Sequence, residues 1–110
     1  MKLPNGDRAI VDDRKLVEYV LNAAHPVGKH HAALFERLLG IGPRQSPLLR
    51  SMLVAAAREE DATAGQQSPH GKKYEQRLTM TGSKGTRTVL AVWLVERGGD
   101  VPRLITCYVE

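Results

Sequence analysis

Residues 73–97 read KYEQRLTMTGSKGTRTVLAVWLVER, and this stretch decides the fold. Apolar and polar side chains alternate over Lys73–Thr81, which is the period of a strand with one buried face. A glycine-bounded turn, GSKG, follows at 82–85. The next run, Thr86–Arg97, is β-branched and aromatic and apolar at successive positions, as expected of a central strand covered on both faces. Together these features predict an antiparallel hairpin.

A third strand follows this hairpin after a short turn. Gly98, Gly99 and Asp100 turn the chain, and the residues 102–109, PRLITCYV, are again extended in pattern. Connections this short join antiparallel neighbours. The part of the chain over 72–109 is therefore predicted to be an antiparallel β-meander of three to four strands.

The N-terminal part has the period of helices. Apolar side chains recur at helical spacing over 13–22, behind an Asp12 or Asp13 cap, over 29–39, and from Ser46 onward until the acidic end at 58–61, where fraying is expected. Residues before them read as an extended arm. The sequence thus predicts one α+β domain over 1–110, with three N-terminal helices (about 12–61) packed on the sheet and a flexible connection over 62–71.

Composition excludes several classes of protein. With 42% apolar and 25% charged residues the chain is ordinary for a globular protein. No apolar run approaches the roughly 20 residues of a membrane helix, and the start lacks the apolar stretch of a signal peptide, so a cytoplasmic protein without membrane contact is expected. The single cysteine, Cys107, is predicted to be a small buried apolar residue. No glycine-rich phosphate loop or dinucleotide motif is present, and no cofactor is expected.

The net charge of +4 is concentrated in one segment. Residues 62–87 hold one acid, Glu75, against five basic residues, which are Lys72, Lys73, Arg77, Lys84 and Arg87. A basic surface of this kind attracts phosphates, anionic lipid or an acidic partner protein.

Three histidines are candidates for proton transfer near neutral pH. His31 falls on the apolar arc of its predicted helix and should point toward the sheet, whereas His30 lies at the edge of that arc. His25 precedes Pro26 in a turn, where its ring can also cap a helix end. The three lack zinc-ligand spacing and nearby cysteines, so no metal site is predicted.

The predicted strands hold a second group of candidates for contacts to a phosphodiester. The guanidinium group of arginine and the ammonium group of lysine bind phosphate oxygens well, and hydroxyl groups can donate hydrogen bonds to them. The side chains of these kinds are Lys72, Lys73, Arg77, Arg87, Arg103, Thr106 and Tyr108. Strict alternation places Arg103 on the opposite face of the third strand from Thr106 and Tyr108. Only a bulge after Pro102 would bring them together.

Four short motifs carry a resemblance to a known family: Leu3-Pro4-Asn5, His25-Pro26-x-Gly28, Lys73-Tyr74 and 102–108, PRLITCY. In these the chain resembles small uncharacterised bacterial proteins that are often encoded beside another small protein, as toxin–antitoxin pairs are. In those relatives the position of His31 is commonly lysine, and either side chain can donate a proton or hold a phosphate. The layout also looks like the barnase, colicin and RelE-like group of metal-independent ribonuclease toxins.

Whether the chain is an enzyme is left open by its residues, and three functions remain as hypotheses. The first is the toxin of a bacterial pair that cleaves RNA without metal by 2′-hydroxyl attack, with an antitoxin-like protein as partner. In it His31 or His25 is the base, Arg87 and Arg103 hold the phosphate, Lys73 or Tyr108 assists the leaving oxygen, and Lys72, Arg77, His30 and Thr106 bind substrate. The alternatives are a non-catalytic protein-binding module, such as an immunity protein, and nucleic-acid binding without cleavage. No oligomeric state is assigned.

Overall fold

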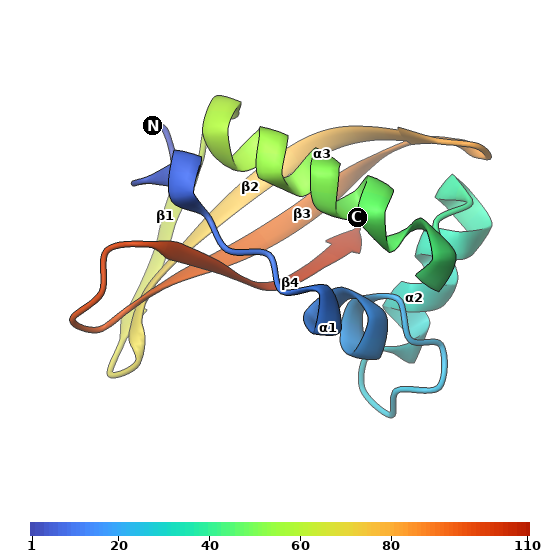
Figure 1. Cartoon of the computed structure of the whole chain (residues 1–110), viewed down its shortest axis with the longest axis horizontal. Helices are drawn as coiled ribbons and strands as arrows, with labels where there is room; N and C mark the ends of the chain where they lie inside the picture. Colours follow the sequence, from blue (N-terminus) through green and yellow to red (C-terminus); the bar gives the residue numbers. More distant parts are fainter.

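The computed structural model describes residues 1–110, and its central feature is a four-stranded antiparallel sheet. The strands lie in chain order, each paired with the next: β1 (Thr63–Ser68), β2 (Gly71–Gly82), β3 (Gly85–Glu96) and β4 (Pro102–Val109). The helices precede the sheet in the chain (Figure 1). The predicted α+β class and the antiparallel meander of β2, β3 and β4 are therefore confirmed.

The three predicted helical segments are present. In chain order the helical elements are η1 (Gly6–Arg8), α1 (Asp13–Lys15), η2 (Leu16–Val20), α2 (Lys29–Leu34), η3 (Phe35–Leu39), η4 (Pro43–Gln45) and α3 (Ser46–Glu59). Asp12 caps α1 as expected, since its Oδ1 accepts from the Arg14 amide at 2.9 Å. Each of the first two segments ends in a π-helix, η2 and η3 respectively. In η2 the side chains of Leu16 and Val20 are buried.

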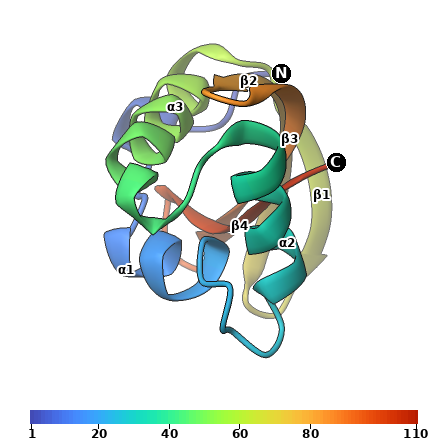
Figure 2. The same ribbon diagram turned by 90° about the vertical axis from the view of Figure 1, so that its right-hand side faces the viewer.

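The helices do not all lie on one layer. Viewed along the strands, α1 and α3 lie on one side of the sheet while α2 stands at its end (Figure 2). The helix α2 contacts β4, and η3 contacts β2 and β3. The second helical segment therefore reaches the border between the covered and the uncovered face of the sheet.

The segment 62–71, predicted as a flexible connection, is mostly strand, and that prediction is wrong. β1 pairs with β2 from Thr63 opposite Glu75 to Ser68 opposite Gly71, with a bulge between Ala64 and Gln67. As an edge strand, β1 is held by backbone hydrogen bonds and leaves most of its side chains exposed. The residues TAGQQS consequently show no alternation of apolar and polar side chains.

The sheet has two chemically different faces. The helix face is the one packed under α1 and α3, and its strand side chains are Tyr74, Gln76, Leu78, Met80, Val89, Ala91, Trp93, Leu104, Cys107 and Val109. The opposite face, called the outer face below, holds the alternate side chains of the same strands. The predicted alternation in β2 is confirmed, since Tyr74, Leu78 and Met80 are buried while Arg77 and Thr79 are exposed.

A bulge in β4 changes which of its side chains share a face. Val92 of β3 pairs with Thr106, but the next residue, Trp93, pairs with Leu104, so Ile105 is an extra residue in the ladder. Because of this shift Arg103 lies on the outer face together with Thr106 and Tyr108. From the sequence, these three side chains could share a face only with a bulge in the strand, and the structure has that bulge.

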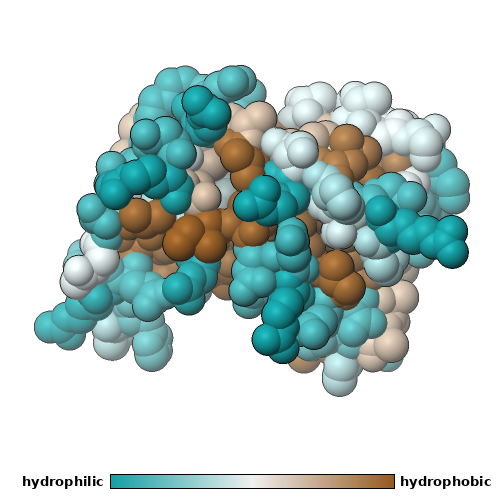
Figure 3. Space-filling view, viewed as in Figure 1, coloured by the Kyte–Doolittle hydropathy of each residue, from teal (hydrophilic) through white to brown (hydrophobic).

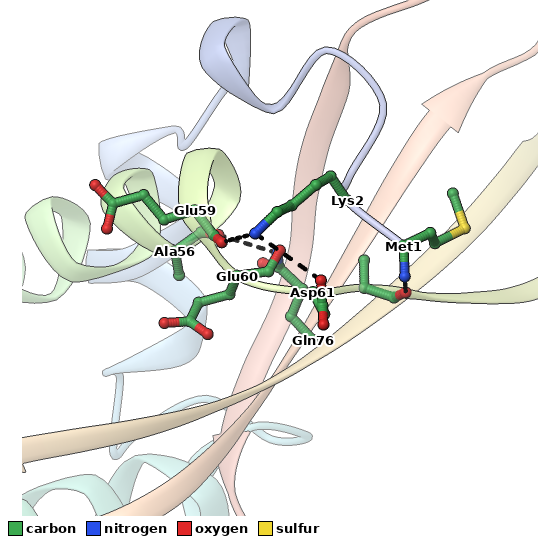
Figure 4. Close-up of polar contacts among 8 residues, drawn as sticks. Met1, Lys2, Ala56, Glu59, Glu60, Asp61 and Gln76 are labelled. Atoms are coloured by element: carbon green, nitrogen blue, oxygen red, sulfur yellow. Dashed lines mark hydrogen bonds and ion pairs between the residues drawn. The ribbon is translucent and has the colours of Figure 1, made fainter.

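A buried amide ties α3 to the sheet. The Nε2 of Gln76 donates to the carbonyl oxygens of Ala56 at 3.0 Å and Glu60 at 3.1 Å, and its Oε1 accepts from Nε1 of Trp93 at 2.9 Å. Lys2 donates to the Glu59 carbonyl in the same turn (Figure 4). The end of α3, where fraying was expected, therefore has side-chain donors on its last carbonyls.

The N-terminal arm runs beside both edges of the sheet. Lys2 forms an antiparallel bridge with Asp61, and Ile10 forms a parallel bridge with Arg103, with the Ile10 amide donating to Pro102 O at 2.9 Å. On the side of the molecule seen in Figure 3, apolar surface forms a broken band among hydrophilic groups. The predicted extended arm is confirmed only in part, because η1 interrupts it at Gly6–Arg8, and its residue Ile10 covers part of the β4 edge.

We expect Gln76→Met to lower the free energy of unfolding by about 2–3 kcal/mol. The substitution keeps the side-chain volume but leaves the buried Trp93 N–H without an acceptor and the Glu60 carbonyl without its side-chain donor, while the Ala56 carbonyl keeps only the Glu60 amide. Urea unfolding of this variant and of Gln66→Met, at an exposed position, measures the effect. A Gln76→Met variant within 0.5 kcal/mol of the parent, on the scale of ordinary surface changes, would contradict it.

The buried thiol of Cys107 predicts a loss of stability in alkali. Desolvation raises the pKa of this thiol from 9.0 to about 12. Because the unfolded chain releases the proton at lower pH, the free energy of unfolding should fall above pH 9 by about 1.4 kcal/mol per pH unit more than in Cys107→Ala. Denaturant titrations at pH 8, 9, 10 and 11 measure the difference, and parallel curves for the two proteins would refute it.

Candidate functional site

The outer face gathers polar and charged side chains into three rows across β2, β3 and β4. The cross-strand registers define them as Arg77–Leu90–Tyr108, Glu75–Val92–Thr106 and Lys73–Leu94–Arg103. Side chains at the centre of each row are apolar, and those of Val92 and Leu94 are half-buried. The face therefore combines an apolar middle with ionic groups at the sides.

His31 joins this face from α2. Its ring stacks on Tyr108 with 4.6 Å between ring centroids and 28° between planes, and the residue remains exposed. The prediction that His31 points toward the sheet is confirmed by this contact. An exposed imidazole held against a tyrosine can exchange protons with a ligand on the outer face.

The carboxylate of Glu110, which was not among the residues predicted from the sequence, also lies on the outer face. The Oε1 of Glu110 is 2.8 Å from Nε of Arg77, so the ion pair reaches from β2 to the residue after β4. The Glu110 amide donates to Thr88 O at 3.0 Å, which extends the ladder past Val109. Only the spacing of two residues from Tyr108 could have placed Glu110 on this face.

The other two basic groups of the face differ in their surroundings. Nη1 of Arg103 lies 2.9 Å from Oε1 of Glu96, and both side chains are about half exposed. Lys73 takes part in none of the ion pairs. The outer face thus holds three basic residues, Lys73, Arg77 and Arg103, against the three acids Glu75, Glu96 and Glu110, and has no net charge excess.

Two predicted phosphate ligands lie elsewhere. The β2–β3 register is unbroken, so Arg87, opposite Met80, belongs to the helix-face side, and its Nη1 donates to Thr86 O at 2.9 Å. Lys72 is also on that side, with Nζ 5.7 Å from the Tyr74 ring centroid. The prediction that Arg87 and Arg103 hold one phosphate is therefore wrong, because strand alternation points them to opposite faces.

The remaining histidine candidates are separate from the outer-face groups. The Nδ1 of His25 accepts from the amides of Val27 at 3.0 Å and Gly28 at 3.1 Å, and its ring packs edge-on against Tyr19 at 4.8 Å. This ring holds the turn before α2. His30 is exposed on α2 and makes no side-chain hydrogen bond or ring contact. Of these three, His31 alone stacks on a sheet residue.

A hollow in the surface lies beside α1. It encloses about 480 Å³ and is lined by Asp12, Arg14, Lys15, Glu18, Tyr19 and His25. Most of its polar groups already have partners, since Asp12 caps α1, Arg14 pairs with Glu18 at 3.3 Å, and Lys15 lies over the Tyr19 ring. The residues that line this hollow include none of the outer face.

The outer face has a smaller hollow next to β1. It measures about 260 Å³ and is lined by Gly65, Gln66, Lys73, Glu75 and Val92. The absence of a side chain at Gly65 keeps it open toward the Lys73 backbone, where a Cβ would lie 3.3 Å from the carbonyl oxygen. A second hollow, of about 360 Å³, lies at the other side of this face, where Glu96 and Arg103 are among its lining residues.

Metal-binding clusters and membrane-spanning helices are two further features that bear on function. No group of three or more histidine, cysteine or acidic side chains converges in a way that could hold a metal ion. None of the helices has the length and apolar character needed to cross a membrane.

Comparison with known proteins places the fold and the family. A chain in the contact-dependent growth inhibition toxin–immunity protein complex from Klebsiella pneumoniae 342 has a similar fold, with a TM-score of 0.71 and 16% sequence identity over 92% of this chain and 99% of that chain. No curated protein matches the sequence. The family model described as "Domain of unknown function (DUF6883)" matches residues 2–110. Because the match spans nearly the whole chain, this protein belongs to the DUF6883 family.

Proposed function

We propose that the chain is a toxin domain that cleaves RNA without a metal ion, and that its outer face is the site of cleavage. The observation that carries the proposal is the His31–Tyr108 stack on the same face as the Arg77–Glu110 ion pair. This arrangement offers an imidazole, a carboxylate and a guanidinium on one accessible surface. Metal-independent RNA cleavage needs these kinds of group.

The proposed reaction requires two proton transfers. Glu110 takes the proton of a ribose 2′-hydroxyl, whose oxygen then forms a bond to the neighbouring phosphorus. The bond from phosphorus to the 5′-oxygen breaks, and His31 supplies the proton to that leaving oxygen. The products are a 2′,3′-cyclic phosphate and a 5′-hydroxyl.

Arg77 and the hydroxyl groups of the face have supporting roles in this proposal. The guanidinium of Arg77 uses Nε for Glu110, which leaves its terminal nitrogens for the phosphate oxygens. Tyr108 orients the His31 ring by stacking, and Thr106 lies one row away with a free hydroxyl. In this proposal the base is Glu110 rather than His31 or His25. The Glu110 carboxylate shares the outer face with His31 and can accept the proton, which leaves His31 to act as the acid. The His25 Nδ1 already accepts hydrogen bonds from two backbone amides.

The toxin part of the proposal draws on the fold. The similar chain comes from a toxin–immunity complex, which supports a toxin or immunity-like role. A toxin of this class acts where RNA is present and is held inactive by a partner protein. We therefore propose RNA as substrate and a small protein, similar in role to an antitoxin or immunity protein, as partner.

The second candidate function is a non-catalytic protein-binding module, for example an immunity protein. The observation in its favour is the balanced charge of the outer face, where Arg77 and Arg103 already hold carboxylates around an apolar middle. Such a surface, apolar at the centre and polar at the rim, is usual for protein interfaces. In that case the outer face binds protein and the chain cuts no RNA.

We expect His31→Ala and Glu110→Gln each to reduce RNA cleavage at least 100-fold, since general acid–base groups contribute about 10²–10⁴-fold. The matched control is His30→Ala, which removes an exposed imidazole from the adjacent position of α2 and should retain activity. The measurement is cleavage of total RNA and of ribosome-bound message by the purified proteins, with and without a chelator.

Growth of bacteria that express the same variants provides a second readout. Arrest by the parent and by His30→Ala, with relief by His31→Ala, is the expected pattern. RNA left intact by the parent protein under all these conditions, or full activity of His31→Ala, would remove the ribonuclease proposal in favour of the binding module.

A further inference from the structure

We infer that Lys73 and Arg103 form a second phosphate subsite, which holds an extended single-stranded RNA away from the point of cleavage. This inference rests on the proposed function and names its substrate class. The two side chains come from β2 and β4 and flank Leu94 in one row of the outer face. They meet there only because the bulge at Ile105 turns Arg103 to this face.

The distance between the two ends of the face sets the length of RNA. The row of Lys73 and Arg103 crosses β3 at Leu94, four residues from Leu90 in the row of Arg77 and Tyr108. At about 3.3 Å per residue this is roughly 13 Å. That length corresponds to about four nucleotides at the ~3.4 Å rise of a stacked strand and to fewer in an extended one. A dinucleotide bound at His31 is therefore too short to reach the second subsite.

The surface between the two ends suits bases that are not paired. Val92 and Leu94 are half-buried and leave an apolar floor, against which the faces of bases or riboses can pack. The 260 Å³ recess lies directly beside Lys73, and its wall includes the exposed amide side chain of Gln66. A duplex hides its bases within the stack and cannot use either feature.

The basic groups of the subsite are available at small cost. Lys73 has no ion-pair partner, and the Arg103–Glu96 pair is about half exposed on both sides. Exposed pairs of this kind contribute roughly 0–1 kcal/mol, so a phosphate can replace Glu96 or share the guanidinium with it. Glu96 then acts as a competitor for Arg103, and its removal should strengthen RNA binding.

The test compares two double variants with the same charge change. Lys73→Gln/Arg103→Gln removes the subsite, while Lys72→Gln/Arg87→Gln removes two basic groups from the helix-face side. The probes are a 2′-O-methyl hexanucleotide and a 2′-O-methyl dinucleotide, neither of which offers a 2′-hydroxyl for attack. Affinities are measured at several salt concentrations.

We expect the subsite variant to bind the hexanucleotide about tenfold or more weakly, with the slope of log affinity against log salt smaller by about 1.4. Its dinucleotide affinity should change less than twofold, and the control variant should bind both probes within about twofold of the parent. Glu96→Gln should bind the hexanucleotide several-fold more tightly, a gain that misfolding would not produce. Equal losses in the two double variants, or no loss in the subsite variant, would overturn the inference.

The outcomes separate this inference from the proposed function. Binding that depends on Lys73 and Arg103, in a protein that cuts no RNA, supports the subsite and removes the catalytic proposal. Cleavage that is indifferent to Lys73 and Arg103 supports the catalytic proposal and removes the subsite. Failure of the parent to bind the hexanucleotide, with polyglutamate bound through these two residues instead, assigns the face to an acidic protein and overturns both.

Discussion

The buried amide of Gln76 fixes how α3 sits on the sheet, and the packing of the helix face depends on that position. Apolar packing between α3 and β2 is not directional and would tolerate sliding of one element along the other. The amide removes this freedom, because its donors need the Ala56 and Glu60 carbonyls while its oxygen needs the Trp93 N–H. A buried polar group with every partner satisfied selects one packing among several apolar ones.

Strand alternation, broken at one point, determines which charges can meet. The unbroken β2–β3 register separates Arg87 from the outer face, and the single bulge in β4 brings Arg103 onto it. The basic excess of residues 62–87 is therefore divided between the two faces of the sheet. Net charge along the chain was a poor guide to the site, since neighbouring basic residues in a strand point in opposite directions.

Elements with a strong period were predictable from the sequence. The three helical segments and β2, β3 and β4 follow from apolar spacing, whereas β1 has no such spacing and is defined by backbone pairing. Of the site, His31 followed from its helical arc. Glu110 did not, because its place on the outer face is defined by an ion pair with Arg77, a residue far away in the sequence. Long-range register is the information that local patterns lack.

Folding and the proposed chemistry use opposite sides of the same strands. Every strand residue of the core cluster belongs to the helix face, and even Leu90, buried on the outer face, is not part of that cluster. Substitutions at exposed outer-face positions should therefore leave the core undisturbed. His31 connects the two sides, because Phe35 lies one helical turn further on and is fully buried in the core. The position of the imidazole over Tyr108 is thus tied to core packing on the helix face of the sheet, so an exposed ring on an open surface is still held in place.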